Sequence, residues 1–291
     1  MRLTVSLLLG ICFVAALSQA ISAETIRVPE DFEDVGWALR EATYGDTILV
    51  APGKYWVQGR LRSGVKILSA EGPDSTTLWN SRWYILKLVD CDIETVVDGF
   101  TMEGKGGNTC LACTTGAPII TNNTIRDSWD GINLVECNAF MKGNTISGCN
   151  RGAQCEFSEA QFVENNFEHN VSAISIVSAA PVIARNRFFS NGKAVLIQGH
   201  SYPTIGGRLE IANDFIENSY GVFNVGYRTD GAIFTAEREV AIATHNYWGS
   251  ECPRDRLFMG EVVISPWTDA AHDTLFYDCP EVPAEPESES R

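Results

Sequence analysis

The feature that most constrains this chain is an Asn-x-(Ile/Phe) triplet that recurs at nearly constant spacing. In five successive copies the Asn residues are 21, 21, 21 and 27 residues apart. Eight residues after each Asn the chain has Gly or Ala, followed by an apolar or small residue. The five residues are Asn123, Asn144, Asn165, Asn186 and Asn213. Such a period predicts an array of stacked units, each in contact mainly with its neighbours.

A repeat of this length fits a leucine-rich repeat or a parallel β-helix, and the residues favour the second. The Leu-x-x-Leu-x-Leu signature is absent. Each unit instead carries a short alternating piece, such as Ile132 and Leu134 or Ile174 and Ile176, whose side chains would point inward from a strand. Asn, Gly, Ser and Asp lie between these pieces and favour turns. We therefore expect the chain to coil, with the repeated Asn side chains hydrogen-bonded along a column.

The two ends of the chain differ from the repeat. Residues 1–23 combine a basic start with an uncharged apolar run, which is typical of a secretory signal peptide and predicts a secreted or periplasmic protein. Residues 24–268 form the predicted β-helix domain, which begins with a capping helix over 29–42 and a strand over 47–50. Residues 269–291 form a C-terminal segment ending in an acidic, Pro- and Glu-rich tail that we expect to be disordered.

Charge and hydropathy limit the partners. The 291 residues include 22 Lys and Arg against 37 Asp and Glu, which gives a net charge of -15. Nucleic-acid binding needs clustered basic side chains, so no nucleic-acid partner is expected. Beyond the signal peptide no apolar stretch approaches the roughly 18 residues needed to cross a bilayer. We expect a monomer without a membrane span.

The cysteines suggest disulfide bonds. Removal of residues 1–23 leaves eight of the nine cysteines, and an even number in an exported chain favours disulfides. Cys252 and Cys279 are the expected pair because both lie in the C-terminal segment, apart from the others. The spacing of Cys110 and Cys113 leaves a zinc site open as an alternative.

Several segments resemble a known family. Residues 45–55, 67–73 and 246–249 are similar to the first coils and the C-terminal end of right-handed parallel β-helix proteins of the pectin lyase-like superfamily, closest to NosD-like and other secreted bacterial members. The resemblance covers about residues 25–268 and implies an all-β right-handed parallel β-helix solenoid. It also implies a NosD-like role in metal delivery as one option, although soft ligands are sparse, with four Met and four His.

The resemblance does not by itself imply an activity, because the fold hosts lyases, hydrolases, esterases, adhesins and binding proteins. Polygalacturonase-like hydrolases use an Asn-x-Asp, an adjacent Asp pair and a Gly-His-Gly, and none of these motifs is present; Gly199-His200-Ser201 is the nearest fragment. The Gly53-Lys54-Tyr55 turn resembles pectin methylesterases, but the Glu that they have two residues after the Tyr is replaced here by Val57. Whether the protein is an enzyme stays open. If it is one, we expect a polysaccharide lyase or glycoside hydrolase with a variant, calcium-dependent site.

One candidate site is acidic. Asp90, Asp92 and Glu94 alternate along an expected strand with residues whose side chains we expect to point into the core. Three outward carboxylates at that spacing offer the hard oxygen ligands that calcium prefers. Further ligands would have to come from a neighbouring coil, and the sequence does not identify them. A solvated acidic face is the alternative.

A second candidate site is neutral and suits carbohydrate. The 21-residue register places Asn133 and Gln154 in one outward column with Ser175, and amides and hydroxyls in a row match the hydroxyls of an extended sugar chain. The candidate residues are Trp129, Asn133, Gln154, Glu156 and Gln198. Ordinary solvent exposure explains the same pattern. We therefore expect a secreted β-helix protein that binds an extracellular or cell-surface polysaccharide, with catalysis as the alternative.

Overall fold

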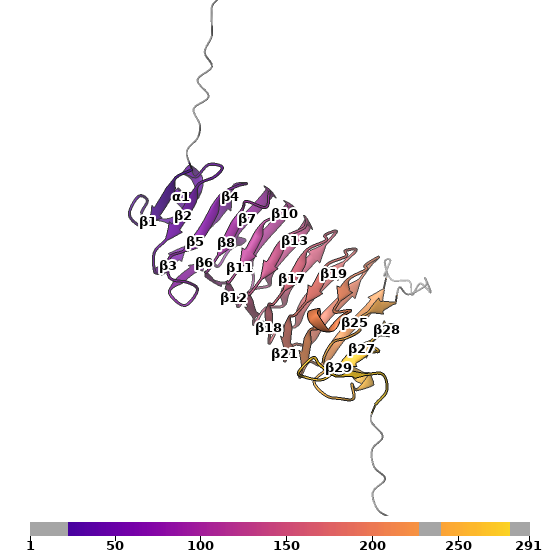
Figure 1. The fold of residues 1–291 in the computed structure, drawn as a ribbon. Coiled ribbons are helices and arrows are strands. Elements are labelled where there is room, and N and C mark those ends of the chain that lie inside the picture. Colours follow the sequence, from indigo (N-terminus) through magenta and orange to yellow (C-terminus); the bar gives the residue numbers. More distant parts are fainter. Residues whose placement is uncertain (1–22, 227–239, 280–291) are drawn as a thin grey trace, which may run out of the picture.

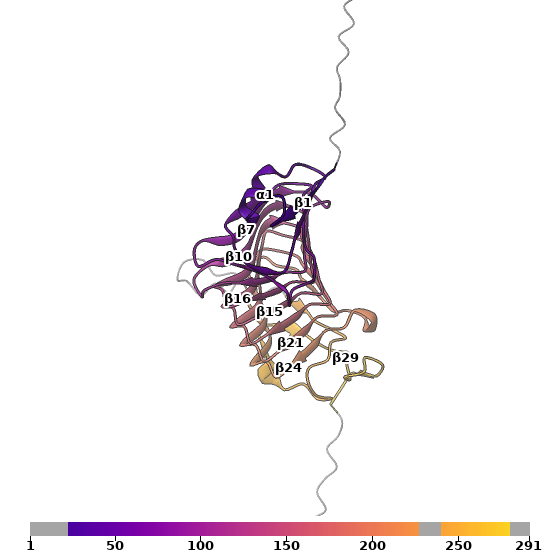
Figure 2. The same cartoon turned by 90° about the vertical axis from the view of Figure 1, so that its left-hand side faces the viewer.

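The computed structural model describes residues 23–226 and 240–279, which fold into a right-handed parallel β-helix (Figure 1). Three parallel sheets, here called A, B and C, run along the solenoid with nine, eight and nine strands. Each coil passes through the three sheets in turn, so strands one coil apart are hydrogen-bonded neighbours. The stacked coils can be followed from the N-terminal end in Figure 2, and buried apolar side chains fill the space between the three sheets. The expected fold is confirmed.

The strands are short, because each coil must turn three times. Sheet A contains β1 (Thr25–Val28), β2 (Thr47–Val50), β5 (Lys66–Ser69), β8 (Val96–Asp98), β11 (Ile119–Thr121), β14 (Phe140–Lys142), β17 (Gln161–Val163), β20 (Val182–Ala184) and β23 (Thr204–Ile205). Sheet B contains β3 (Gly53–Trp56), β6 (Thr76–Trp79), β9 (Thr101–Glu103), β12 (Thr124–Arg126), β15 (Thr145–Ser147), β18 (Asn166–Glu168), β21 (Arg187–Phe189) and β24 (Asp214–Ile216). Sheet C contains β4 (Gly59–Leu61), β7 (Tyr84–Cys91), β10 (Thr109–Gly116), β13 (Asp130–Cys137), β16 (Arg151–Glu156), β19 (Ser172–Val177), β22 (Lys193–Gln198), β25 (Tyr220–Gly226) and β27 (Phe258–Met259).

The N-terminal end of the core is covered by α1 (Val35–Glu41), close to β4 in Figure 1. The expected cap over 29–42 is therefore present but shorter. The helix begins after Asp34, whose carboxylate accepts a hydrogen bond of 2.9 Å from the backbone N of Trp37. Val35, Ala38 and Leu39 are its buried residues. The strand expected over 47–50 is β2.

The C-terminal end is built from short elements. Two 3-10 helices, η1 (Leu209–Ile211) and η2 (Asp255–Leu257), lie outside the regular coils. β26 (Ala241–Ile242) pairs with β28 (Val262–Val263), and β29 (Trp267–Thr268) pairs with antiparallel β30 (Leu275–Phe276). The expected disulfide between Cys252 and Cys279 is present in this region.

The repeated Asn residues form an internal ladder at the corner between sheets A and B. The Asn165 Oδ1 accepts from the backbone N of Asn144 at 3.0 Å, and the Asn165 Nδ2 donates to Asn186 Oδ1 at 3.1 Å and to Met141 O at 3.0 Å. The ladder runs from Asn123 to Asn246. These buried amides are therefore structural, as expected.

A second ladder, which we did not foresee, lies at the corner between sheets B and C. Asn170 and Asn191 bond to each other in the same way, at 3.0 and 3.1 Å, and Asn191 bonds to Asn218. One coil earlier the corresponding position is Cys149, whose backbone N donates to Asn170 Oδ1 at 3.0 Å. The ladder therefore ends at a thiol.

The repeated small residue has a packing reason. A Cβ atom on Gly131 would lie 2.5 Å from the carbonyl O of Gly152 and 3.1 Å from Ile146 Cγ2 in the core. The following residue, Ile132, is buried as well, so two consecutive residues face inward where each sheet C strand begins. The space left there admits only a small side chain, which explains the Gly or Ala eight residues after each Asn.

Two sequence-based expectations concern residues outside the described part of the chain. These are residues 1–22 of the expected signal peptide and residues 280–291 of the expected tail. Within 23–226 and 240–279 no helix is long and apolar enough to cross a bilayer.

Candidate functional site

The candidate site lies on the outer face of sheet C, where the strand register stacks outward side chains in columns. The central column takes one residue from each strand from β4 to β25. Its members are Arg60, Lys87, Ala112, Asn133, Gln154, Ser175, Leu196 and Phe223. The structure thus stacks Asn133, Gln154 and Ser175 as the 21-residue spacing predicts.

Two amide side chains in the middle of this column have a buried oxygen that is not hydrogen-bonded within the described residues. Gln154 is only 6% exposed although its strand position faces outward. Its Oε1 atom and the Oδ1 atom of its register partner Asn133 are buried, and neither has a hydrogen-bond partner among the described residues. A buried acceptor without a partner costs about 1–3 kcal/mol. Two such atoms on adjacent strands therefore mark a place where donors from a ligand would be favourable.

A charged pair lies beside these amides. Arg151 donates from Nε and Nη2 to Asp130 Oδ1 and Oδ2 at 2.5 and 2.9 Å, across neighbouring strands. Asp130 is 4% exposed. The fork of the guanidinium matches the carboxylate, so this pair is held rigidly. We did not predict this pair from the sequence, although Asp130 and Arg151 are 21 positions apart and hence in the same register.

The other predicted carbohydrate residues lie around the amides but not all together. Trp129 is 51% exposed at the corner that leads into β13, and its backbone N bonds to Asn108 O at 2.9 Å. Glu156 and Gln198 belong to a column alongside the central one, where Val177 separates them. The structure thus places Trp129 one residue before the Asp130–Arg151 pair, and it places Gln198 two strands away from Glu156.

The expectation that Asp90, Asp92 and Glu94 share one strand face is wrong. β7 ends at Cys91, and the chain then turns, because Asp90 has a left-handed backbone with φ of 54°. Ile93, expected in the core, is 66% exposed. Alternation holds only inside a strand, so it does not apply beyond this corner.

Each of the three carboxylates has a partner within the protein. Asp90 accepts from Thr115 Oγ1, and Glu94 lies 3.7 Å from Lys66 Nζ. Asp92 accepts from the backbone N of Glu94 at 3.0 Å. Within 23–226 and 240–279 no three His, Cys, Asp or Glu side chains are grouped so that they could hold a metal ion. The geometry therefore gives the expected calcium site no cluster of ligands.

Asp92 has a structural role in this turn. Burial opposes its ionisation, but hydrogen bonds from Tyr44, Glu94 and Ser63 outweigh that effect and hold the pKa of Asp92 below its ordinary value. The same hydrogen bond, in which Tyr44 donates to Asp92, raises the pKa of Tyr44. An ionised Asp92 therefore fastens the turn between sheets C and A.

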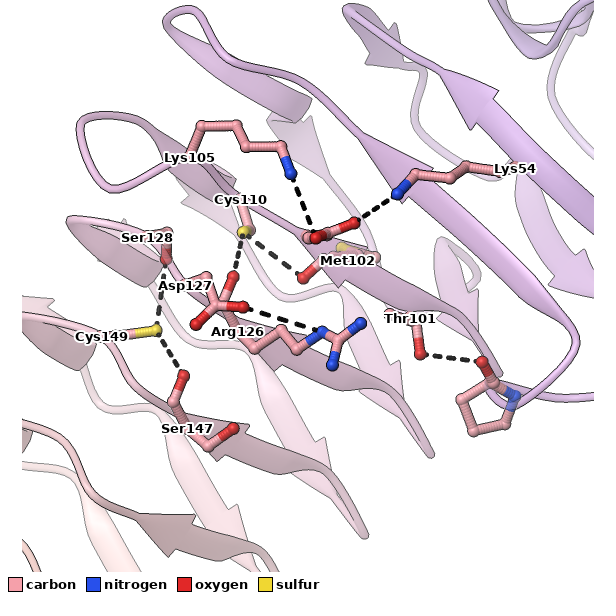
Figure 3. Close-up of polar contacts among 12 residues, drawn as sticks. Lys54, Thr101, Met102, Lys105, Cys110, Arg126, Asp127, Ser128, Ser147 and Cys149 are labelled. Carbon is pink, nitrogen blue, oxygen red and sulfur yellow. Dashed lines mark hydrogen bonds and ion pairs between the residues drawn. The ribbon is translucent and has the colours of Figure 1, made fainter.

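Cys110 and Cys113 are not part of any group of three His, Cys, Asp or Glu side chains in the described ranges that could hold a metal ion. Figure 3 shows Cys110 directed at the carbonyl O of Met102 and Cys149 beside Ser128, whose Oγ lies 3.3 Å from the sulfur of Cys149. Cys113 interacts with Cys137 instead. Burial raises the pKa of Cys110 to about 12, so this thiol stays protonated. The two cysteines therefore serve different parts of the core.

Comparison with known proteins defines the class. Residues 74–235 match the family described as "Right handed beta helix region", which covers more than half of the chain. The protein therefore belongs to the right-handed β-helix family. No curated protein matches the sequence.

Among solved structures, ORF18 of Geobacillus virus E2 is 11% identical, with a TM-score of 0.44, over 74% of this chain and 52% of the viral chain. This chain thus spans about half of the viral protein. An alginate lyase from Paenibacillus sp. str. FPU-7 is 18% identical, with a TM-score of 0.39, over 77% and 86% of the two chains. Pectate lyase Pel9A is 10% identical, with a TM-score of 0.44, over 87% and 80%. At these identities the likeness concerns the fold alone.

Proposed function

We propose that this protein is an exported β-helix protein that binds an extended carbohydrate chain along the outer face of sheet C. The observation that carries the proposal is the pair of buried, unpartnered amide oxygens of Asn133 and Gln154. Sugar hydroxyls are donors that could satisfy both oxygens at once, since the strands that carry them are roughly 4.8 Å apart.

The surroundings of the two amides support the same ligand. The exposed ring of Trp129 offers a flat apolar surface for a sugar ring. At the far end of the column the Phe223 ring is partly buried, with Lys193 Nζ 5.2 Å from its centroid and Tyr220 packed edge-on at 4.8 Å. Trp129 lies beside β13, at the edge of sheet C, and Phe223 lies at the β25 end of the column. Aromatic surfaces this far apart, with hydrogen-bonding groups between them, suit a polymer better than a small molecule.

The proposal is tested by retention of the mature protein on a panel of immobilised neutral and acidic polysaccharides. Reducing ends and unsaturated products are followed in the same incubation. We expect saturable retention without product. Gln154→Leu and Asn133→Leu each replace an amide acceptor by an apolar side chain and should weaken binding about tenfold.

The control is Gln161→Leu, which makes the same change at an exposed position of sheet A. It should leave retention unchanged. Equal affinity of all three variants and the wild type would remove sheet C from consideration. Product formation would instead make the protein an enzyme.

A further inference from the structure

A cavity of about 620 Å³ lies at the N-terminal end of the same outer face, between α1, β4 and the end of β7. Three arginines from different parts of the chain line it: Arg40 of α1, Arg60 of β4, and Arg62 just after β4. Leu39 and Val89 provide apolar wall. The chain has a net charge of -15, but these three guanidinium groups make the cavity a locally positive region.

None of the three arginines forms an ion pair with a residue of 23–226 or 240–279. The arginines that form ion pairs in the described ranges are Arg27, Arg126, Arg151, Arg185 and Arg187, so none of the three in the cavity is among them. Asp90 is the carboxylate among the lining residues, and it accepts a hydrogen bond from Thr115. The cavity therefore keeps a surplus of positive charge, because guanidinium groups stay protonated.

Two of the side chains are held in place. Arg62 Nη1 donates to the carbonyl O of Ala42 at 2.8 Å, and the Arg40 guanidinium lies 4.7 Å from the centroid of the Trp37 ring. Both contacts reduce the conformational entropy that would be lost on binding an anion. Arg60 is exposed and has no such contact with the described residues, so its donors can reach a ligand in the cavity.

The cavity shares Arg60 with the central column of the proposed carbohydrate surface. Arg60 heads the central column of sheet C and is followed in register by Lys87, Ala112 and Asn133. Four strand steps separate Arg60 from Gln154, which corresponds to roughly 19 Å. A chain of several sugar units could therefore contact the two amides and the cavity together.

We infer that this arginine cavity binds an anionic substituent of the bound sugar chain, so that the ligand is an acidic polysaccharide. The inference rests on the proposed function of sheet C. Arginine is suited to this task because its planar fork donates two parallel hydrogen bonds to a carboxylate or sulfate oxygen pair. The apolar walls strengthen the attraction by limiting access of water.

The test compares matched probes by titration calorimetry at low and high salt. One pair consists of a galacturonate oligosaccharide and the corresponding neutral galactose oligosaccharide, and a second pair consists of dextran sulfate and dextran. Alginate is added as a second uronate chain. The variant is Arg40→Gln with Arg60→Gln, since Arg62 also holds the end of α1. Arg208→Gln, an exposed arginine next to η1, is the control of equal charge change per site.

The expected result is a loss of about tenfold or more in affinity for at least one acidic chain in the double variant, with affinity for neutral chains and the Arg208→Gln control unchanged. This loss should shrink at high salt. The preferred acidic probe then tells carboxylate from sulfate. Unchanged affinity of the double variant for every acidic chain, or retention of neutral chains alone, would overturn the inference. Failure of the proposed function has a different signature, in which the wild type binds no chain of either kind.

Discussion

Two stacks of amide side chains in this molecule have different roles. In the ladder between sheets A and B, the side chain of Asn165 accepts from one coil and donates to the next, so its polar atoms are satisfied within the core. On sheet C, the oxygens of Asn133 and Gln154 are buried without a partner in the described part of the chain. The same chemistry in the same register thus stabilises the solenoid at the corner and leaves binding capacity on the face.

The largest effect is expected from a substitution that interrupts the Asn ladder between sheets A and B. Asn165→Leu removes the acceptor of Asn144 and the donor to Met141, and it leaves buried polar atoms on both neighbouring coils. We expect the free energy of unfolding to fall by about 3 kcal/mol or more, measured by denaturant unfolding. Gln161→Leu on the exposed face should change it by less than about 0.5 kcal/mol. A similar small loss in both variants would mean that the ladder contributes little.

A smaller effect on stability is expected from a substitution that extends the second ladder, at the corner between sheets B and C. Cys149→Asn places an amide one coil before Asn170, where its Nδ2 can donate to Asn170 Oδ1. The free energy of unfolding should rise by about 1 kcal/mol. Cys155→Asn puts the same residue on an inward strand position without a ladder, and it should destabilise the protein. Destabilisation in both variants would show that the amide column cannot be extended.

On the face of sheet C, Trp129→Ala should weaken binding of the glycan identified by the panel by roughly fivefold. Because Trp129 is half exposed, its removal should leave the free energy of unfolding nearly unchanged. Trp56→Ala, which removes a similarly exposed ring from sheet B, serves as the matched control in the same titration. Equal losses from the two substitutions would argue against a stacking role at the corner.

The smallest expected effect is a pH dependence of the free energy of unfolding that comes from the capped N-terminal end and not from the Asn ladder. Burial opposes ionisation of Asp46, but hydrogen bonds from the backbone N of Glu24 and from Thr43 outweigh this effect and hold the pKa of Asp46 below its ordinary value. A lowered pKa in the folded state contributes stability above the unfolded pKa, and this is lost as pH falls through the folded pKa. Asp46→Asn should therefore destabilise the protein at neutral pH, with the difference from the wild type shrinking below about pH 4. A constant difference across pH would contradict this.

The sequence predicted most of the fold, because a period of 21 fixes register. The stacking of Asn133 on Gln154 and the ladder through Asn165 both follow from it. The prediction of an outward strand face failed at Asp90, because the alternation of residue types does not identify the corner at which a strand ends. The arginine cavity was also beyond prediction, since Arg40, Arg60 and Arg62 meet through the packing of α1 on the first coils rather than through the repeat.

The most direct test of the central claim measures stability and affinity together in the double variant Asn133→Leu, Gln154→Leu. If these amides serve a ligand, the free energy of unfolding should stay the same or rise, because two unsatisfied buried acceptors are removed, while glycan affinity falls at least tenfold. A clear loss of stability with unchanged affinity would contradict the account, since it would place the two amides with the structural ladder.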